Sequence, residues 1–199
     1  MYYIDYALGT GQSGGISEPE YLADVAKFSQ YLRSQPEVIH VQTISDTFKR
    51  LNKNMHGDDP AWQRLPEERN LAAQYLLLYE MSLPYGLDLN NQIDVDKSAT
   101  KIAVTLKTLT SNEVIAFDDA AIQWLNDNMP SIQPYTSSPT IMFAHLGKRN
   151  INSMLTGTTV ALVLISAVLI FFLGSLKYGF ISLLPVSYTH LTLPTTPYV

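Results

Sequence analysis

The first 149 residues alternate between two apolar patterns, one typical of strands and the other of helices. In the opening segment, every second side chain from Tyr2 to Leu8 is apolar, which predicts a half-buried strand. The predicted strands are 1–8, 38–44, 87–95, 102–106 and 140–146, with the third and fourth joined as an antiparallel hairpin by a turn near Lys97. Strands mixed with helices predict an α+β fold.

Four segments between these strands carry the spacing of amphipathic helices. The predicted helices cover 17–33, 45–53, 67–81 and 110–128. The first opens with Ser17 and, three positions later, Glu20, which is the capping-box pattern. Thr110 and Glu113 repeat this pattern at the last helix, and Ser45 is the predicted cap of the second.

The same spacing predicts which side chains of the first and last helices face the core. They are Leu22, Val25, Phe28, Ser29 and Leu32 in the first helix, and Val114, Phe117, Ala121, Trp124 and Leu125 in the last. The segment 54–66 combines Gly57 with two prolines among polar residues, so it is predicted as a loop and a seam between subdomains. Trp62 is expected to fix this loop to the core.

The alternation ends at Asn150, because no charged residue occurs between Arg149 and Lys177. The apolar stretch 150–176 exceeds the roughly 20 residues that a helix needs to cross a bilayer, which predicts a transmembrane helix. The alternative is the buried central helix of a soluble protein, which is also apolar on all sides. The stretch contains no ionisable residue, so it supplies no group for a proton relay.

Composition refines this picture. The averages of 46% hydrophobic and 16% charged residues are those of a soluble protein, but Lys177 is the only Lys, Arg, Asp or Glu after Arg149. The chain therefore joins a polar domain to a membrane segment. A net charge of -5 without a basic patch argues against a nucleic-acid partner, and the absence of cysteine excludes disulfides and thiolate metal sites.

One glycine motif matches a cofactor signature. Gly9, Gly11 and Gly14 spell G-x-G-x-x-G between a predicted strand and a predicted helix, as in dinucleotide-binding folds. The helix begins three residues too late, however, to direct its N-terminus at a pyrophosphate, and the acidic residue expected about 20 positions later is missing. A strand-to-helix loop is therefore the favoured interpretation, and no cofactor is predicted.

The remaining ionisable residues do not form a recognisable site. Asp88, Asp94 and Asp96 are interpreted as the solvated face of the predicted hairpin, with a hard-cation site as the alternative. The other candidates are His40, His56 with Asp58 and Asp59, Glu80 and His145. None has a partner at metal-ligand or triad spacing, so the sequence predicts no catalytic, cofactor-binding or metal-ligating residue and no enzymatic activity.

The order of the predicted elements resembles the porter domain of the RND superfamily of transporters, in particular the predicted exporters of the MMPL type. The resemblance is carried by YYIDYALGTGQSGGISEPEYLADVAKFSQYLRSQPEVIHVQTISDTFKRLN, LAAQYLLLYEMSLPYGLDLNNQIDVDKSATKIAVTLKTLTSNEV, WLNDNMP and SMLTGTTVALVLISAVLIFFLGSLKYGFISLLP. It covers 1–185, and the order of these segments is more specific than any one of them.

The resemblance implies ferredoxin-like β-α-β porter subdomains that lie between the first and second membrane helices of a repeat. By this analogy, residues 1–149 lie on the periplasmic or extracellular side of the plasma (inner) membrane, 150–176 cross it inward, and 177–185 begin the next membrane segment. The implied function is that of a fragment of a proton-driven exporter of lipids or other hydrophobic compounds. Its implied partners are the lipid bilayer, the hydrophobic substrate and the rest of the transporter.

The chain departs from the family pattern at its ends. The family places a membrane helix before the porter domain and further helices, with proton-coupling acids, after SLLP, so no proton-relay residue is carried over to this sequence. The tail 186–199 continues neither a membrane helix nor a core and is expected to be foreign to the protein. The alternative function is a single-pass, membrane-anchored extracytoplasmic binding or assembly module without transport activity.

Overall fold

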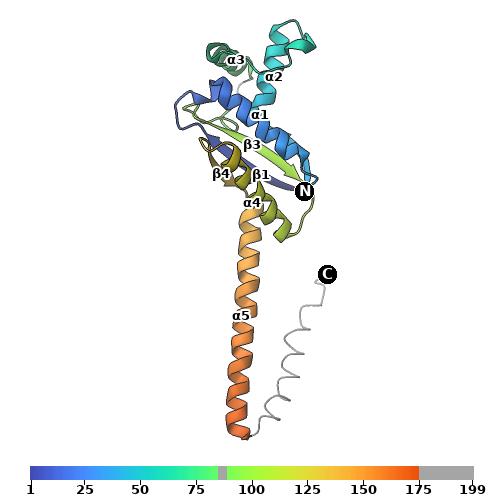
Figure 1. The fold of residues 1–199 in the computed structure, drawn as a ribbon, viewed down its shortest axis with the longest axis vertical. Helices are drawn as coiled ribbons and strands as arrows, with labels where there is room; N and C mark the ends of the chain where they lie inside the picture. Colours follow the sequence, from blue (N-terminus) through green and yellow to red (C-terminus); the bar gives the residue numbers. More distant parts are fainter. Residues whose placement is uncertain (85–88, 175–199) are drawn as a thin grey trace. The chain divides into compact units, whose positions relative to one another are not determined.

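The computed structural model describes residues 1–84 and 89–174 and has an α+β fold (Figure 1). In chain order, the elements are β1 (Tyr2–Gly9), η1 (Gly15–Ser17), α1 (Pro19–Ser34), β2 (Val38–Gln42), α2 (Ile44–Met55), η2 (Pro60–Trp62), α3 (Arg69–Ser82), β3 (Ala99–Leu106), α4 (Ser111–Asn128), β4 (Gln133–Ser137) and α5 (Pro139–Leu173). Residue contacts divide the chain into two compact units, Met1–His145 and Leu146–Val199.

The four strands form one sheet with the order β2-β3-β1-β4, in which every neighbouring pair is antiparallel. Because β1 and β2 both run antiparallel to β3, they are parallel to each other and are joined through α1. By the same reasoning, β3 and β4 are parallel, are joined through α4 and have β1 between them. Two β-α-β units are therefore interleaved in one sheet, and the strands before and after the segment 54–66 share it.

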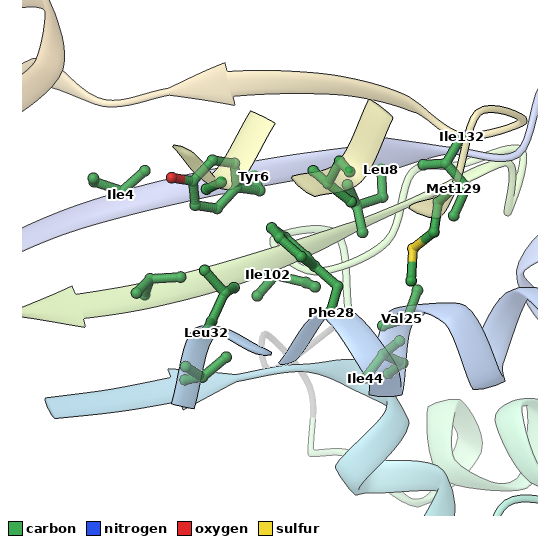
Figure 2. Packing of buried hydrophobic residues seen from close by; sticks show 14 of the residues in the cluster. Ile4, Tyr6, Leu8, Val25, Phe28, Leu32, Ile44, Ile102, Met129 and Ile132 are labelled. Carbon is green, nitrogen blue, oxygen red and sulfur yellow. The ribbon is translucent and has the colours of Figure 1, made fainter. Parts of the chain in front are cut away.

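The core lies on one face of this sheet. Ile4, Tyr6 and Leu8 of β1 are fully buried and alternate with half-buried or exposed residues, as the period of a strand requires. Figure 2 shows Phe28 of α1 beneath this face, and its ring stacks on Trp124 of α4 with the centroids 5.6 Å apart. The two crossover helices therefore meet over the same side of the sheet.

The predicted helix faces are largely confirmed. All five residues predicted to face the core in α1 are buried, and in α4 Val114, Phe117, Ala121 and Leu125 are buried while Trp124 is partly buried. Thr110 caps α4 as predicted, since its hydroxyl accepts from the Glu113 amide and the Glu113 carboxylate accepts from the Thr110 amide.

Two predicted caps are wrong. Ser17 lies in η1, and α1 begins after Glu18, with Pro19 in its first position. In α2 the cap is Thr43, whose hydroxyl accepts from the amide of Ser45. In both cases the helix is present: α1 starts at Pro19, which suits the first helical position, and in α2 the neighbouring Thr43 is an equally suitable cap.

The predicted hairpin is confirmed only in part within the described residues, because its first strand is reduced to one antiparallel bridge. Residues 89–97 form turns with one isolated bridge between Ile93 and Thr100, and Val95 is 88% exposed. Leu89 and Ile93 are buried, but β3 takes its strand partners from β1 and β2. The predicted turn near Lys97 is confirmed, and Lys97 has a positive φ of 54°.

The strand predicted over 140–146 is a helix. It forms the first turns of α5, where Ile141 and Ala144 are buried at helical spacing, and the last strand is β4, before it. Trp62, expected to join the core, lies instead outside the buried cluster. Its ring stacks on His56 at 3.6 Å, and the Arg64 guanidinium lies 4.7 Å from the ring centroid, so it orders the loop itself.

Candidate functional site

The apolar helix α5 is the first candidate for a functional element. It is the one helix among residues 1–84 and 89–174 that is long and apolar enough to cross a membrane, with a mean hydropathy of 2.4 over an 18-residue window. None of that window is buried inside the protein, unlike the central helix of a soluble domain. At about 1.5 Å per residue, 150–173 alone extends for roughly 36 Å, which is more than a hydrocarbon core.

Two hydroxyls in the apolar part of this helix bond to its own backbone. The hydroxyl of Thr159 donates to the carbonyl of Leu155 at 2.8 Å, and that of Ser166 donates to the carbonyl of Leu162. Such bonds remove the cost of placing a hydroxyl in hydrocarbon. The described residues do not include the end of the predicted membrane helix, 175–176, the predicted next membrane segment, 177–185, or the tail, 186–199.

The glycine motif forms a loop whose amides are already used. Thr10, Gly14 and Ile16 donate their backbone N–H groups to the carbonyls of Ser98, Asp96 and Lys97, at 2.8, 2.9 and 3.2 Å. Helix α1 then starts behind Glu18, whose carboxylate pairs with Arg69 at 3.0 Å. A phosphate at this helix end would meet an acid, so the geometry supports the interpretation of the motif as a connecting loop.

The aspartates of the predicted hairpin separate in the structure. Asp94 caps the turn before β3, because its carboxylate accepts from the amides of Ser98 and Ala99 at 2.6 and 2.7 Å. Desolvation opposes the effect, but the bonds from Ser98 and Ala99 hold the pKa of Asp94 below its ordinary value. Asp96 is exposed, Asp88 lies outside the described residues, and no cluster of three metal-ligating side chains occurs among the residues described.

The histidine and acidic candidates in the segment 54–66 make contacts with nearby residues. His56 shares a hydrogen bond of 2.8 Å with the carbonyl of Asn52, Asp58 pairs with Lys53 at 3.1 Å, and Asp59 caps η2. Among the other candidates, Glu80 forms an ion pair of 2.7 Å with Lys97, and His40 and His145 are exposed. These residues do not converge on one site.

A partly buried polar cluster that was not predicted lies between the sheet and α4. Tyr6 of β1 and Thr136 of β4 are directly opposite each other in the antiparallel register, so both side chains lie on the same face. Thr136 donates to the carboxylate of Asp118 at 3.2 Å, whereas the fully buried hydroxyl of Tyr6 makes no close hydrogen bond within the described part of the chain. The signal in the sequence is an acid, Asp118, on the inward stripe of a helix four residues after Val114.

Burial shifts the acidity of both groups. Desolvation raises the pKa of the Tyr6 phenol, and the negative charge of Asp118 beside it raises it further. Desolvation also raises the pKa of Asp118, and the Thr136 and Tyr6 hydroxyls offset part of that effect. The charge of Asp119 raises the pKa of Asp118, and that of His145 lowers it.

An apolar cleft of about 270 Å³ lies within the first unit, near the start of α5. Tyr2, Leu109, Val114, Phe143 and Ala144 supply most of its apolar lining. Phe143 is 66% exposed, so the cleft carries a large aromatic side chain that nothing in the described chain covers. Its size suits a short apolar segment of a ligand better than a whole drug-sized molecule.

Comparison of the chain with known proteins identifies no relative, so the functional argument rests on the fold and on α5. No protein-family model matches the chain, and a comparison with curated proteins finds no match.

Proposed function

We propose that this chain is part of a proton-driven membrane exporter of the RND superfamily and MMPL type that moves lipids or other hydrophobic compounds. In this proposal, residues 1–149 form an extracytoplasmic domain that handles substrate, at the plasma (inner) membrane. Helix α5 crosses the membrane toward the cytoplasm as the second helix of a repeat. The rest of the transporter supplies the acidic residues that couple proton flow to transport.

The observation that carries the proposal is the strand order β2-β3-β1-β4 followed directly by an apolar helix. Two interleaved β-α-β units in this order support the proposed ferredoxin-like arrangement, which the family uses in its porter domain. Along the chain, only Ser138 separates β4 from α5. The fold alone supports many functions, and the attached helix favours this one.

Two further features support the proposal, one concerning the substrate and the other the role of α5. The cleft beside Phe143 offers apolar surface within the first unit. Helix α5 contains no Asp, Glu, Lys or Arg between Asn150 and Leu173, which suits a structural helix beside a transport path rather than a proton relay.

A topology experiment tests the orientation. Reporters are inserted in the loop at Gly57 and fused after Lys177 in the uninterrupted gene product. We expect the first reporter to respond as extracytoplasmic and the second as cytoplasmic. An external signal after Lys177 would contradict the proposed direction of α5.

A transport experiment separates the two candidate functions. Cells that express the uninterrupted gene product are loaded with a fluorescent phosphatidylethanolamine, and its release is followed with and without a protonophore. Release that stops with the protonophore supports the exporter. Normal membrane insertion without any release would favour a single-pass binding or assembly module, which agrees with α5 being the one candidate span among the described residues.

A further inference from the structure

We infer that Asp118 is a proton-binding site of the first unit, and that proton uptake there strengthens the packing of α4 on β1 and β4. This inference goes beyond the proposed function and does not depend on transport, because every group involved lies within Met1–His145.

The argument starts from the unequal hydrogen bonding of three side chains. Tyr6 and Thr136 project from neighbouring strands toward α4, which carries Asp118. The carboxylate of Asp118 accepts a bond from Thr136, and the buried Tyr6 hydroxyl beside it makes no close hydrogen bond among residues 1–84 and 89–174. A buried donor or acceptor that lacks a partner loses its hydration without compensation.

The charges around Asp118 do not compensate its ionisation. It belongs to no ion pair among the described residues. The charge of Asp119, its neighbour on α4, disfavours the ionised form of Asp118, whereas the charge of His145 on α5 favours that form. On the side of α1, Tyr31 acts on Tyr6 and contributes no positive charge. A half-buried carboxylate that faces two neutral hydroxyls and another acid, and no paired cation, is therefore poorly stabilised.

A proton on Asp118 changes two interactions at once. It removes the charge that is expensive to bury, and it adds an O–H group that can donate to the Tyr6 oxygen, which the ionised carboxylate cannot do. The direction of the pKa shift agrees with this geometry, since burial raises the pKa of Asp118. A group whose pKa is higher in the folded than in the unfolded chain stabilises the fold fully below its unfolded pKa, ordinarily 3.8 for Asp, and loses that effect as pH rises through the folded pKa.

The test compares thermal unfolding of the whole chain in detergent micelles between pH 3 and pH 8 for the natural protein and Asp118→Asn. We expect the variant to have the higher Tm at pH 7, and the difference to shrink toward zero as pH falls below the ordinary pKa of Asp. The matched control is Asp127→Asn, an exposed acid on the same helix, whose curve should run parallel to that of the natural protein. A Tm difference between Asp118→Asn and the natural protein that is constant from pH 3 to pH 8 would overturn the inference.

A direct measurement keeps the inference testable if Asp118→Asn does not fold. The side-chain carboxyl carbon of Asp118 is followed by NMR during a pH titration of the natural protein and of Thr136→Val. We expect its midpoint above the ordinary Asp value, and a further upward shift in Thr136→Val, since that variant loses the bond that favours the ionised form. A midpoint at or below the ordinary value in the natural protein would also overturn the inference.

Discussion

Tyr6 of β1 and Tyr21 of α1 both bury a phenol ring, but they differ in what the hydroxyl meets. Tyr21 donates to the carbonyl of Leu8 at 2.7 Å and lies 2.8 Å from the hydroxyl of Thr100. Burial raises the pKa of Tyr21 to about 12, although its contacts with Thr100 oppose the shift. The Tyr6 hydroxyl is just as inaccessible and has no such partner.

We predict opposite effects for the two Tyr→Phe substitutions. Tyr6→Phe should raise the free energy of unfolding by about 1 kcal/mol, because it removes a buried hydroxyl that makes no hydrogen bond. Tyr21→Phe should lower it by about 1–2 kcal/mol, because it deprives the Leu8 carbonyl and Thr100 of a partner. Urea unfolding followed by tryptophan fluorescence measures both, and equal signs would contradict the prediction.

Gly15 is required by a close contact rather than by its backbone angle. A Cβ on Gly15 would lie 2.3 Å from Oγ1 and 2.7 Å from Cβ of Thr10. Thr10 cannot easily move away, since its hydroxyl donates to the carbonyl of Ser98 at 2.8 Å. The close approach of Thr10 and Gly15 therefore depends on the absence of a side chain at Gly15.

We predict that Gly15→Ala lowers the free energy of unfolding by about 1–3 kcal/mol through this overpacking. Gly147→Ala is the control, because nothing lies within 4 Å of its added Cβ and alanine favours a helix. Chemical denaturation of both variants checks the difference. A Gly15→Ala variant as stable as the control would show that the Thr10 side chain can move at low cost.

At the scale of elements, two similar sequence patterns have different outcomes. Thr110 with Glu113 makes both reciprocal bonds of a capping box, and the backbone and side-chain bonds from Thr110 lower the pKa of Glu113. Ser17 with Glu20 makes neither, because α1 starts at Pro19 with Glu18 as its cap. The serine lies one residue before the helix boundary.

We predict that Thr110→Ala lowers the free energy of unfolding by about 1 kcal/mol, whereas Ser17→Ala changes it by less than about 0.5 kcal/mol. The first variant loses the acceptor for the Glu113 amide, and the second loses no helix cap. Thermal unfolding followed by circular dichroism measures both. A larger loss in Ser17→Ala would mean that η1 depends on this hydroxyl.

At the scale of the whole molecule, α5 decides where the protein resides. Val163 lies near the middle of the apolar stretch and is 63% exposed in the described structure. A lysine at the centre of a membrane helix costs about 2.5–3.5 kcal/mol in insertion. The same substitution on the surface of a water-exposed helix costs little.

We predict that Val163→Lys strongly reduces the fraction of the protein that resists alkaline extraction from membranes. Val163→Ala, which keeps the helix apolar, should remain integrated. Both variants are compared by blotting of the membrane pellet and the supernatant. Equal retention would contradict a membrane span at this position.

The sequence by itself determined the elements whose signals are local. The apolar length of α5, the inward stripes of α1 and α4, and the Thr110 cap all depend on residues within a few turns of one another. Each of these was predicted at or near its place in the structure, because helix periodicity and capping are properties of a single segment. The first turns of α5 were the exception, since a short apolar run suits a strand as well as a helix.

Only the tertiary structure decided which strands pair and which polar groups are buried together. The alternation over 89–95 suggested a strand, but β3 pairs with β1, whose Tyr6 lies opposite Ile102 far along the chain. The Asp118 cluster depends on the same long-range pairing, because Thr136 meets Tyr6 only when β4 lies beside β1. A hydrophobic pattern fixes which face of a strand is buried, whereas its neighbours in the sheet are chosen by the packing of the whole core.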